Sequence, residues 1–128
     1  MTAARALAGR RILVVDDEPL VALLIEDLLE DAGAEVVGPA SSVAGALGLI
    51  ESKAPDGALL DVNLEGELVY PVARVLSQLG VPFAFVTGYG LLGVDPAFRS
   101  VTVLAKPLQL TGFADRVAQA LGWAVEAR

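Results

Sequence analysis

Four short apolar runs in this chain end at polar residues, and this pattern limits the folds that the sequence can adopt. The runs alternate with segments of helical periodicity, which is typical of β–α units and a parallel sheet. Residues 12–15 precede Asp16 and Asp17, residues 58–60 precede Asp61, residues 83–86 precede Thr87, and residues 101–104 lie just before Lys106 and Pro107. Parallel strands place their carboxyl ends at one edge of a sheet, where ligands bind in open α/β folds. The sequence therefore predicts that three carboxylates, a hydroxyl and an amine meet there.

The segments between the runs predict helices with one apolar face each. The predicted faces comprise Val21, Leu24, Ile25, Leu28 and Leu29; Val43, Ala46, Leu47 and Ile50; Leu68, Val72, Val75, Leu76 and Leu79; and Leu110, Phe113, Ala114, Val117 and Leu121. Gly33 and Gly80 should end the first and third helices, and Ser41 or Ser42 should cap the second.

Residues 35–38 predict a further strand, which brings the total to five. After Thr87, three glycines and Pro96 predict a short, irregular and mobile connection with a shortened fourth helix, because glycine and proline disfavour helices. Right-handed crossovers then favour a doubly wound five-stranded parallel sheet in the order 2-1-3-4-5. We expect the acids to meet between strands 1 and 3, where the chain order reverses.

The composition excludes several classes of function. The chain has 128 residues, no cysteine and no histidine, so disulfides, thiolate or histidine zinc sites and Ser-His-Asp catalysis are ruled out. A net charge of −7 disfavours binding to nucleic acid or to anionic membranes. No apolar run reaches the roughly 18 residues of a membrane span, and arginines interrupt the N-terminal stretch. We expect a cytoplasmic domain over residues 10–124, a flexible lead-in over 1–9, a tail over 125–128 and no output domain.

Carboxylates that lie close together remain ionised only if a cation sits among them. Mg²⁺ takes oxygen ligands and commonly uses one or two carboxylates together with phosphate oxygens. Asp17 and Asp61 are the predicted direct ligands, Asp16 is predicted to act through water, and the backbone carbonyl of Asn63 is a candidate third ligand.

With a metal present, Asp61 could act as the nucleophile toward a phosphoryl donor and form an acyl phosphate. Lys106 would then bind one phosphoryl oxygen, and the Thr87 hydroxyl would donate to another. Taken singly, these residues have simpler explanations, such as a helix-capping charge at Asp16 or a turn at Asp61. Their joint occurrence, in order at four strand ends, favours the functional interpretation.

Over residues 10–122 the chain resembles the response-regulator receiver domain of two-component signalling. The resemblance implies an acidic pair at Asp16 and Asp17, a phospho-accepting Asp61, a switch hydroxyl at Thr87, and a conserved Lys106 followed by a cis bond to Pro107. Residues 61–67 and 85–90 are similar to the single-domain FAT GUY receivers, with Val86 in place of the usual alanine.

That resemblance also implies partners and a cofactor. A bacterial sensor histidine kinase of the HWE or a related class would donate the phosphoryl group in the presence of Mg²⁺, for which Mn²⁺ or Ca²⁺ could substitute. A downstream protein or a phosphotransfer protein would receive the signal. The domain would catalyse only its own phosphorylation and dephosphorylation.

One departure from the family concerns the switch. Most receivers have an aromatic residue three positions before the conserved lysine, where this chain has Val103. Tyr89 is the predicted replacement as the partner of Thr87, and phosphorylation is predicted to order residues 88–98. Within that segment Leu91, Leu92, Val94 and Phe98 are predicted either to form a surface for the downstream partner or to pack on the sheet.

Three other functions fit parts of the sequence. Residues 88–93 match the G-x-G-x-x-G pattern of dinucleotide-binding folds, but Pro96 disfavours the helix that this pattern should open. A phosphatase of the haloacid dehalogenase type would need an acid two residues after Asp61, where the chain has Asn63. A pseudo-receiver that only binds other proteins would not need the complete set of acceptor residues.

Overall fold

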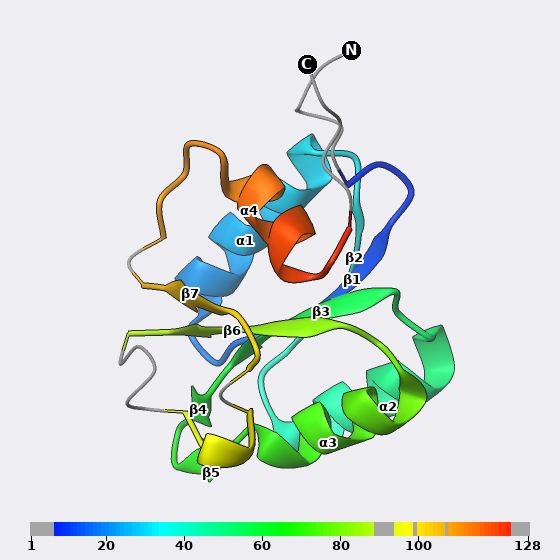
Figure 1. The fold of residues 1–128 in the computed structure, drawn as a ribbon, viewed down its shortest axis with the longest axis vertical. Helices are drawn as coiled ribbons and strands as arrows, with labels where there is room; N and C mark the ends of the chain where they lie inside the picture. The colour runs from blue at the N-terminus through cyan, green and yellow to red at the C-terminus, as the bar shows by residue number, and fades with distance from the viewer. Residues whose placement is uncertain (1–6, 89–93, 99, 107, 124–128) are drawn as a thin grey trace.

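A five-stranded parallel sheet forms the centre of the protein, and helices cover both of its faces (Figure 1). The computed structural model describes residues 7–88, 94–98, 100–106 and 108–123. The strands are β1 (Arg11–Val15), β2 (Glu35–Ala40), β3 (Gly57–Asp61), β6 (Phe83–Thr87) and β7 (Val103–Ala105), in the order β2-β1-β3-β6-β7. Numbered among these five strands alone, this order is 2-1-3-4-5, so the predicted fold class is confirmed.

Two helices pack on each face of the sheet, as Figure 1 shows. The helices are α1 (Pro19–Asp31) and α4 (Phe113–Ala120) on one face, and α2 (Val43–Lys53) and α3 (Tyr70–Leu79) on the other. Alternate strand residues serve the two faces, since Leu13 packs toward α2 and α3 whereas Ile12 and Val14 pack toward α1 and α4. Both faces are covered, which explains why the strands read as unbroken apolar runs.

Two helix boundaries follow the predicted signals. Ser42 caps α2, because its side-chain oxygen accepts a hydrogen bond from the Gly45 backbone N–H at 3.1 Å. Gly80 ends α3 in the left-handed conformation, with φ of 74°. Within the described ranges, no helix has the length and apolar character that a membrane span requires.

The predicted apolar faces were wrong at four leucines, since Leu24, Leu68, Leu79 and Leu110 are exposed. A small antiparallel hairpin of β4 (Asn63–Leu64) and β5 (Glu67–Leu68) takes up Leu68 and delays the start of α3 until Tyr70. The buried residues of the elements concerned are Ala22, Ile25 and Leu29 in α1, Tyr70, Val72, Ala73 and Leu76 in α3, and Phe113, Val117 and Ala118 in α4. Small residues and Tyr70 thus take core positions that the pattern assigned to leucines.

Strand β2 runs two residues past its predicted end, through Gly38 and Pro39 to Ala40. Gly38 has φ of +98°, and a Cβ there would lie 2.9 Å from the Ala40 nitrogen and 3.2 Å from the Val14 carbonyl oxygen. Only glycine adopts this conformation without strain at such a close approach. The extension lets the Ala40 carbonyl accept a hydrogen bond from the Asp16 N–H at 3.0 Å, which helps to fix the end of β1.

The connection between β6 and β7 contains a single-turn 3₁₀ helix, η3 (Pro96–Phe98), among its described residues. Val94 is buried, and Phe98 stacks on Tyr70 with ring centroids 5.5 Å apart and planes at 4°. These two residues therefore pack on the sheet side of the connection instead of forming a free surface. Leu91 and Leu92 lie outside the described residues, as do Tyr89 and the predicted cis bond to Pro107.

Candidate phosphoryl and cation site

The carboxyl ends of β1, β3, β6 and β7 meet at one edge of the sheet, as predicted. Asp61 and Thr87 are the last residues of β3 and β6, while Asp16 and Lys106 directly follow β1 and β7. An open cavity of about 400 Å³ lies at this edge. Its lining includes Asp17, Glu18, Asp61, Asn63, Thr87 and Lys106.

Lys106 lies at the centre of the site and contacts three carboxylates. Its Nζ is 2.6 Å from Glu18 Oε1, 3.2 Å from Asp16 Oδ2 and 3.3 Å from Asp61 Oδ2. The side chains of Asp16, Asp61 and Lys106 are 1%, 10% and 17% exposed, whereas that of Glu18 is 57% exposed. Ion pairs of this kind are weakly screened at the buried end and strongly hydrated at the exposed end.

Backbone hydrogen bonds of the sheet hold the buried members in place. The Lys106 N–H donates to the Thr87 carbonyl oxygen at 3.0 Å, which continues the pairing of β6 with β7. Asp61 pairs with Val86 across β3 and β6. The Asp16 side chain is oriented by a hydrogen bond that its Oδ1 accepts from the Glu18 N–H at 2.9 Å. The geometry of the site is therefore set mainly by strand pairing.

The surroundings of Asp61 and Lys106 change their proton affinities. Burial, followed by the negative charge of Asp16, raises the pKa of Asp61 to about 6, although Lys106 acts in the opposite direction. For Lys106, burial disfavours the charged form, but the hydrogen bond that it donates to Glu18 and the charges of Asp16 and Asp61 outweigh this effect and raise the pKa above its ordinary value. The site thus holds more negative charge than its one lysine balances.

The donor set fits a hard divalent cation. Asp16, Glu18 and Asp61 each offer one carboxylate oxygen, and these three atoms lie within 4.8 Å of one another. Asp16 Oδ2 is buried without a well-aligned hydrogen-bond donor, although Lys106 Nζ is 3.2 Å away. A bound Mg²⁺ or Ca²⁺ would coordinate this buried oxygen, because both ions bind carboxylate oxygens.

Glu18 was missed in the sequence, although it directly follows the acidic pair. Asp17, a predicted direct ligand, is half-buried and lines the cavity but is not a member of the three-carboxylate group. Asn63, the candidate carbonyl ligand, lies in β4 and also lines the cavity. Its side-chain Oδ1 accepts a hydrogen bond from the Gly66 N–H at 2.9 Å, which closes the turn of the β4–β5 hairpin.

Two further contacts connect the surroundings of the site to the helices. Glu67, in the same hairpin, accepts a hydrogen bond from the Val43 N–H at the start of α2, at 3.1 Å. The Tyr70 hydroxyl, at the start of α3, accepts one from the Asp95 N–H at 2.8 Å. Nothing in the spacing of the sequence indicated either contact, because both depend on side-chain reach between separate loops.

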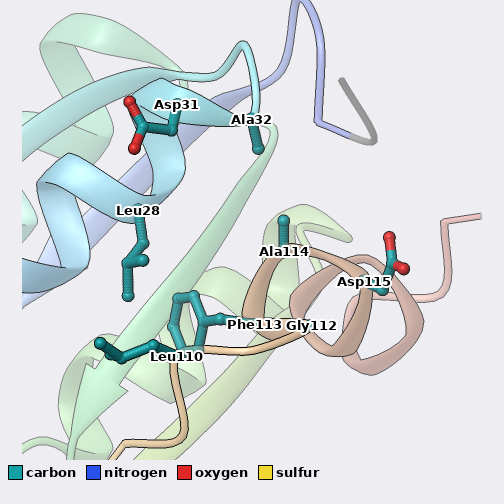
Figure 2. A pocket seen from close by; sticks show the side chains of 8 residues that line it. All are labelled: Leu28, Asp31, Ala32, Leu110, Gly112, Phe113, Ala114 and Asp115. Carbon is teal, nitrogen blue, oxygen red and sulfur yellow. The ribbon is translucent and has the colours of Figure 1, made fainter. Parts of the chain in front are cut away.

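A second hollow, of about 200 Å³, lies between α1 and α4 (Figure 2). Leu28, Leu110 and Phe113 are directed toward one another there, and Asp31 and Asp115 lie at its margin. It adjoins the last turns of α1, which begins at the candidate site and is 13 residues long, or about 20 Å. This mainly apolar hollow is therefore separate from the charged cavity at the strand ends.

Comparisons with known proteins agree with this architecture. Residues 12–117 match the response regulator receiver domain family. The chain is 35% identical over 125 residues to the phyllosphere-induced regulator PhyR of Methylorubrum extorquens, and this match covers 91% of the chain but only 45% of PhyR. The chain thus spans less than half the length of this relative.

Solved structures include relatives of similar length. The solution structure of SdrG from Sphingomonas melonis is 42% identical, with a TM-score of 0.78, and the match covers 94% of this chain and 98% of SdrG. SdrG has also been solved in a BeF₃-activated conformation, which matches at 43% identity with a TM-score of 0.76 and covers 89% of this chain and 98% of SdrG. With its fold, its strand-end site and the match over residues 12–117, this chain belongs to the response regulator receiver domain family.

Proposed function

We propose that this chain is a receiver that accepts a phosphoryl group onto Asp61 in the cytoplasm of a bacterium. The observation that carries the proposal is the position of the Asp61 carboxylate, which lies 3.3 Å from Lys106 Nζ in a cavity that Thr87 also lines. A carboxylate beside a fixed cation suits a nucleophile whose product carries additional negative charge.

In the proposed step, an Asp61 oxygen forms a bond to phosphorus while the P–N bond of a phosphohistidine breaks. The electron pair of that bond stays with the imidazole nitrogen. Lys106 donates to one phosphoryl oxygen and the Thr87 hydroxyl to another, so charge on the transferred group is stabilised as it develops. The chain catalyses only its own phosphorylation and dephosphorylation.

The carboxylates of Asp16 and Asp61, with Asp17 and the Asn63 carbonyl nearby, are the groups that would hold Mg²⁺. When bound, Mg²⁺ would supply positive charge that offsets the acids and the phosphoryl oxygens. Mn²⁺ or Ca²⁺ could take its place, because both also bind oxygen ligands.

The proposed donor is a sensor histidine kinase of the HWE or a related class, and a downstream protein or a phosphotransfer protein receives the signal. The similarity to SdrG and PhyR supports this proposal. We further propose that Tyr89 acts with Thr87 in switching, because Val103 occupies the usual aromatic position.

The direct test is to incubate the protein with acetyl phosphate and Mg²⁺ and to measure the intact mass. Wild type should gain one phosphoryl group that hydroxylamine removes, and Asp61→Asn should gain none. An equal gain in Asp61→Asn would place the acceptor elsewhere. No gain in either protein would favour a pseudo-receiver that functions only by binding other proteins.

A further inference from the structure

Glu18 makes the shortest contact to Lys106, and the proposed phosphotransfer does not use it. The Glu18 Oε1 to Lys106 Nζ distance is 2.6 Å, against 3.2 Å and 3.3 Å for the two aspartates. An ammonium group has three N–H donors, and this one donates to Glu18 and Asp61 and lies 3.2 Å from Asp16 Oδ2. A phosphoryl oxygen that approaches Lys106 therefore competes with these carboxylates for its positive charge and its N–H groups.

Glu18 is the carboxylate best placed to leave. Asp16 and Asp61 are buried at strand ends, where an unpaired charge would be costly. The Glu18 side chain is 57% exposed, so its carboxylate can rotate into water and be rehydrated. Its backbone need not move, because the Glu18 N–H donates to Asp16 Oδ1 and its carbonyl accepts from the Ala22 N–H.

The contact is not a consequence of helix capping. Glu18 occupies the residue just before α1, where a polar side chain commonly accepts a hydrogen bond from the first turn. Its side chain makes no such bond. Instead it reaches Lys106 at the end of β7, 88 residues further along the chain.

We infer that Glu18 is a positioning residue that holds Lys106 in the unphosphorylated protein and releases it when a phosphoryl group binds. This inference rests on the proposed function, since it assumes that Lys106 binds the phosphoryl group. The exchange lowers the affinity of the site for that group, because the contact between Glu18 and Lys106 must first be broken. Glu18 therefore sets how readily the chain enters the phosphorylated state.

The test is a titration with beryllofluoride, a phosphoryl mimic, at saturating Mg²⁺, followed by backbone amide NMR. Glu18→Gln should bind about three- to fivefold more tightly than wild type, as expected for loss of a partly exposed ion pair. Glu18→Asp keeps the charge but is one methylene shorter, so it should also bind more tightly. Glu65→Gln, which removes a charge from the same cavity, is the matched control and should show a smaller change.

A parallel titration with Mg²⁺ alone separates this role from that of a metal ligand. Weaker Mg²⁺ binding by Glu18→Gln, without tighter beryllofluoride binding, would overturn the inference. An affinity of Glu18→Asp for beryllofluoride equal to that of wild type would also overturn the inference. In that case the tighter binding of Glu18→Gln would come from the lost negative charge and not from the lost contact with Lys106. Aspartate is a favourable residue at this helix-flanking position, so Glu18→Asp should fold even if Glu18→Gln does not. If wild type binds no beryllofluoride, the proposed function fails. If all variants bind beryllofluoride as tightly as wild type does, the proposed function stands and the inference about Glu18 is overturned.

Discussion

The buried and the exposed halves of the site are built in different ways. In the buried half, hydrogen bonds between strands position Asp16, Asp61 and Lys106. In the exposed half, Glu18 and the β4–β5 hairpin reach the cavity through side chains and a short turn. Sheet pairing thus fixes the groups that would contact the phosphoryl group, whereas exposed side chains that rotate in water can change how strongly those groups bind it. Variants in each half of the site can test this difference.

Replacement of Lys106 should have the largest effect, because it is a half-buried cation among three acids. Lys106→Met should slow phosphorylation by acetyl phosphate about 100-fold, in line with the loss of one electrostatic donor. Time courses of intact mass would measure it. Lys53→Met is the matched control, since Lys53 is exposed at the end of α2 and is the other lysine of the chain. Equal slowing in both variants would contradict a specific role for Lys106.

The second prediction concerns pH and stability in the absence of divalent cations. Because the pKa of Asp61 rises from 3.8 to about 6 on folding, the folded protein keeps a proton that the unfolded chain loses between these values. This contribution to the free energy of unfolding is complete below pH 4 and is lost as the pH rises to about 6. It amounts to about 2–3 kcal/mol.

Asp61→Asn does not titrate at this position, so its stability relative to wild type should increase by that amount between pH 4 and pH 7. Urea unfolding of both proteins at each pH would measure the difference, in which carboxylates remote from the site cancel, whereas Asp16 interacts with Asp61 by charge. Mg²⁺ at pH 7 should stabilise wild type more than the variant. A difference that does not change with pH would show that Asp61 ionises as it does in water.

A smaller effect is expected at Tyr70, which connects the start of α3 to the segment after β6. Tyr70→Phe keeps the ring stack on Phe98 and removes the hydrogen bond from the Asp95 N–H. The free energy of unfolding should fall by about 1 kcal/mol. Amide hydrogen exchange should become faster at Asp95 if this bond holds the segment, and unchanged exchange would show that ring packing alone suffices.

The smallest effect is expected at the exposed Glu67. Glu67→Ala removes the carboxylate that accepts from the Val43 N–H at the start of α2. A loss of about 0.5–1 kcal/mol in the free energy of unfolding is expected for a capping contact of this kind. Glu65→Ala, in the same hairpin, should cost less. Equal losses in the free energy of unfolding would show that Glu67 does not stabilise the contact between the hairpin and α2.

The buried half of the site could be predicted from the sequence because the position of a strand-end residue is fixed by the topology of the sheet. Once the runs before Asp16, Asp61 and Lys106 are assigned as parallel strands, topology brings these residues to one edge. Leu24, Leu68, Leu79 and Leu110 were assigned wrongly because helical spacing alone does not fix which face is buried. The start of α3 at Tyr70 depends on a hairpin only two residues wide on each side.

The exposed half could not be predicted in the same way. Glu18 adjoins an acidic pair, and nothing in its position shows that its carboxylate would approach Lys106 more closely than Asp61 does. The contacts of Glu67 and Tyr70 join segments 24 and 25 residues apart, and they depend on rotamers that no periodicity specifies. Long-range polar contacts of this kind are determined by the tertiary structure and not by local sequence spacing.

The most direct test of the central claim is to locate the phosphoryl group chemically. After incubation with acetyl phosphate and Mg²⁺, borohydride should reduce the acyl phosphate, and peptide mass spectrometry should then find homoserine at position 61. Homoserine at Asp16, Asp17 or another aspartate, or the corresponding longer alcohol at a glutamate, with Asp61 intact, would contradict the assignment of Asp61 as the acceptor.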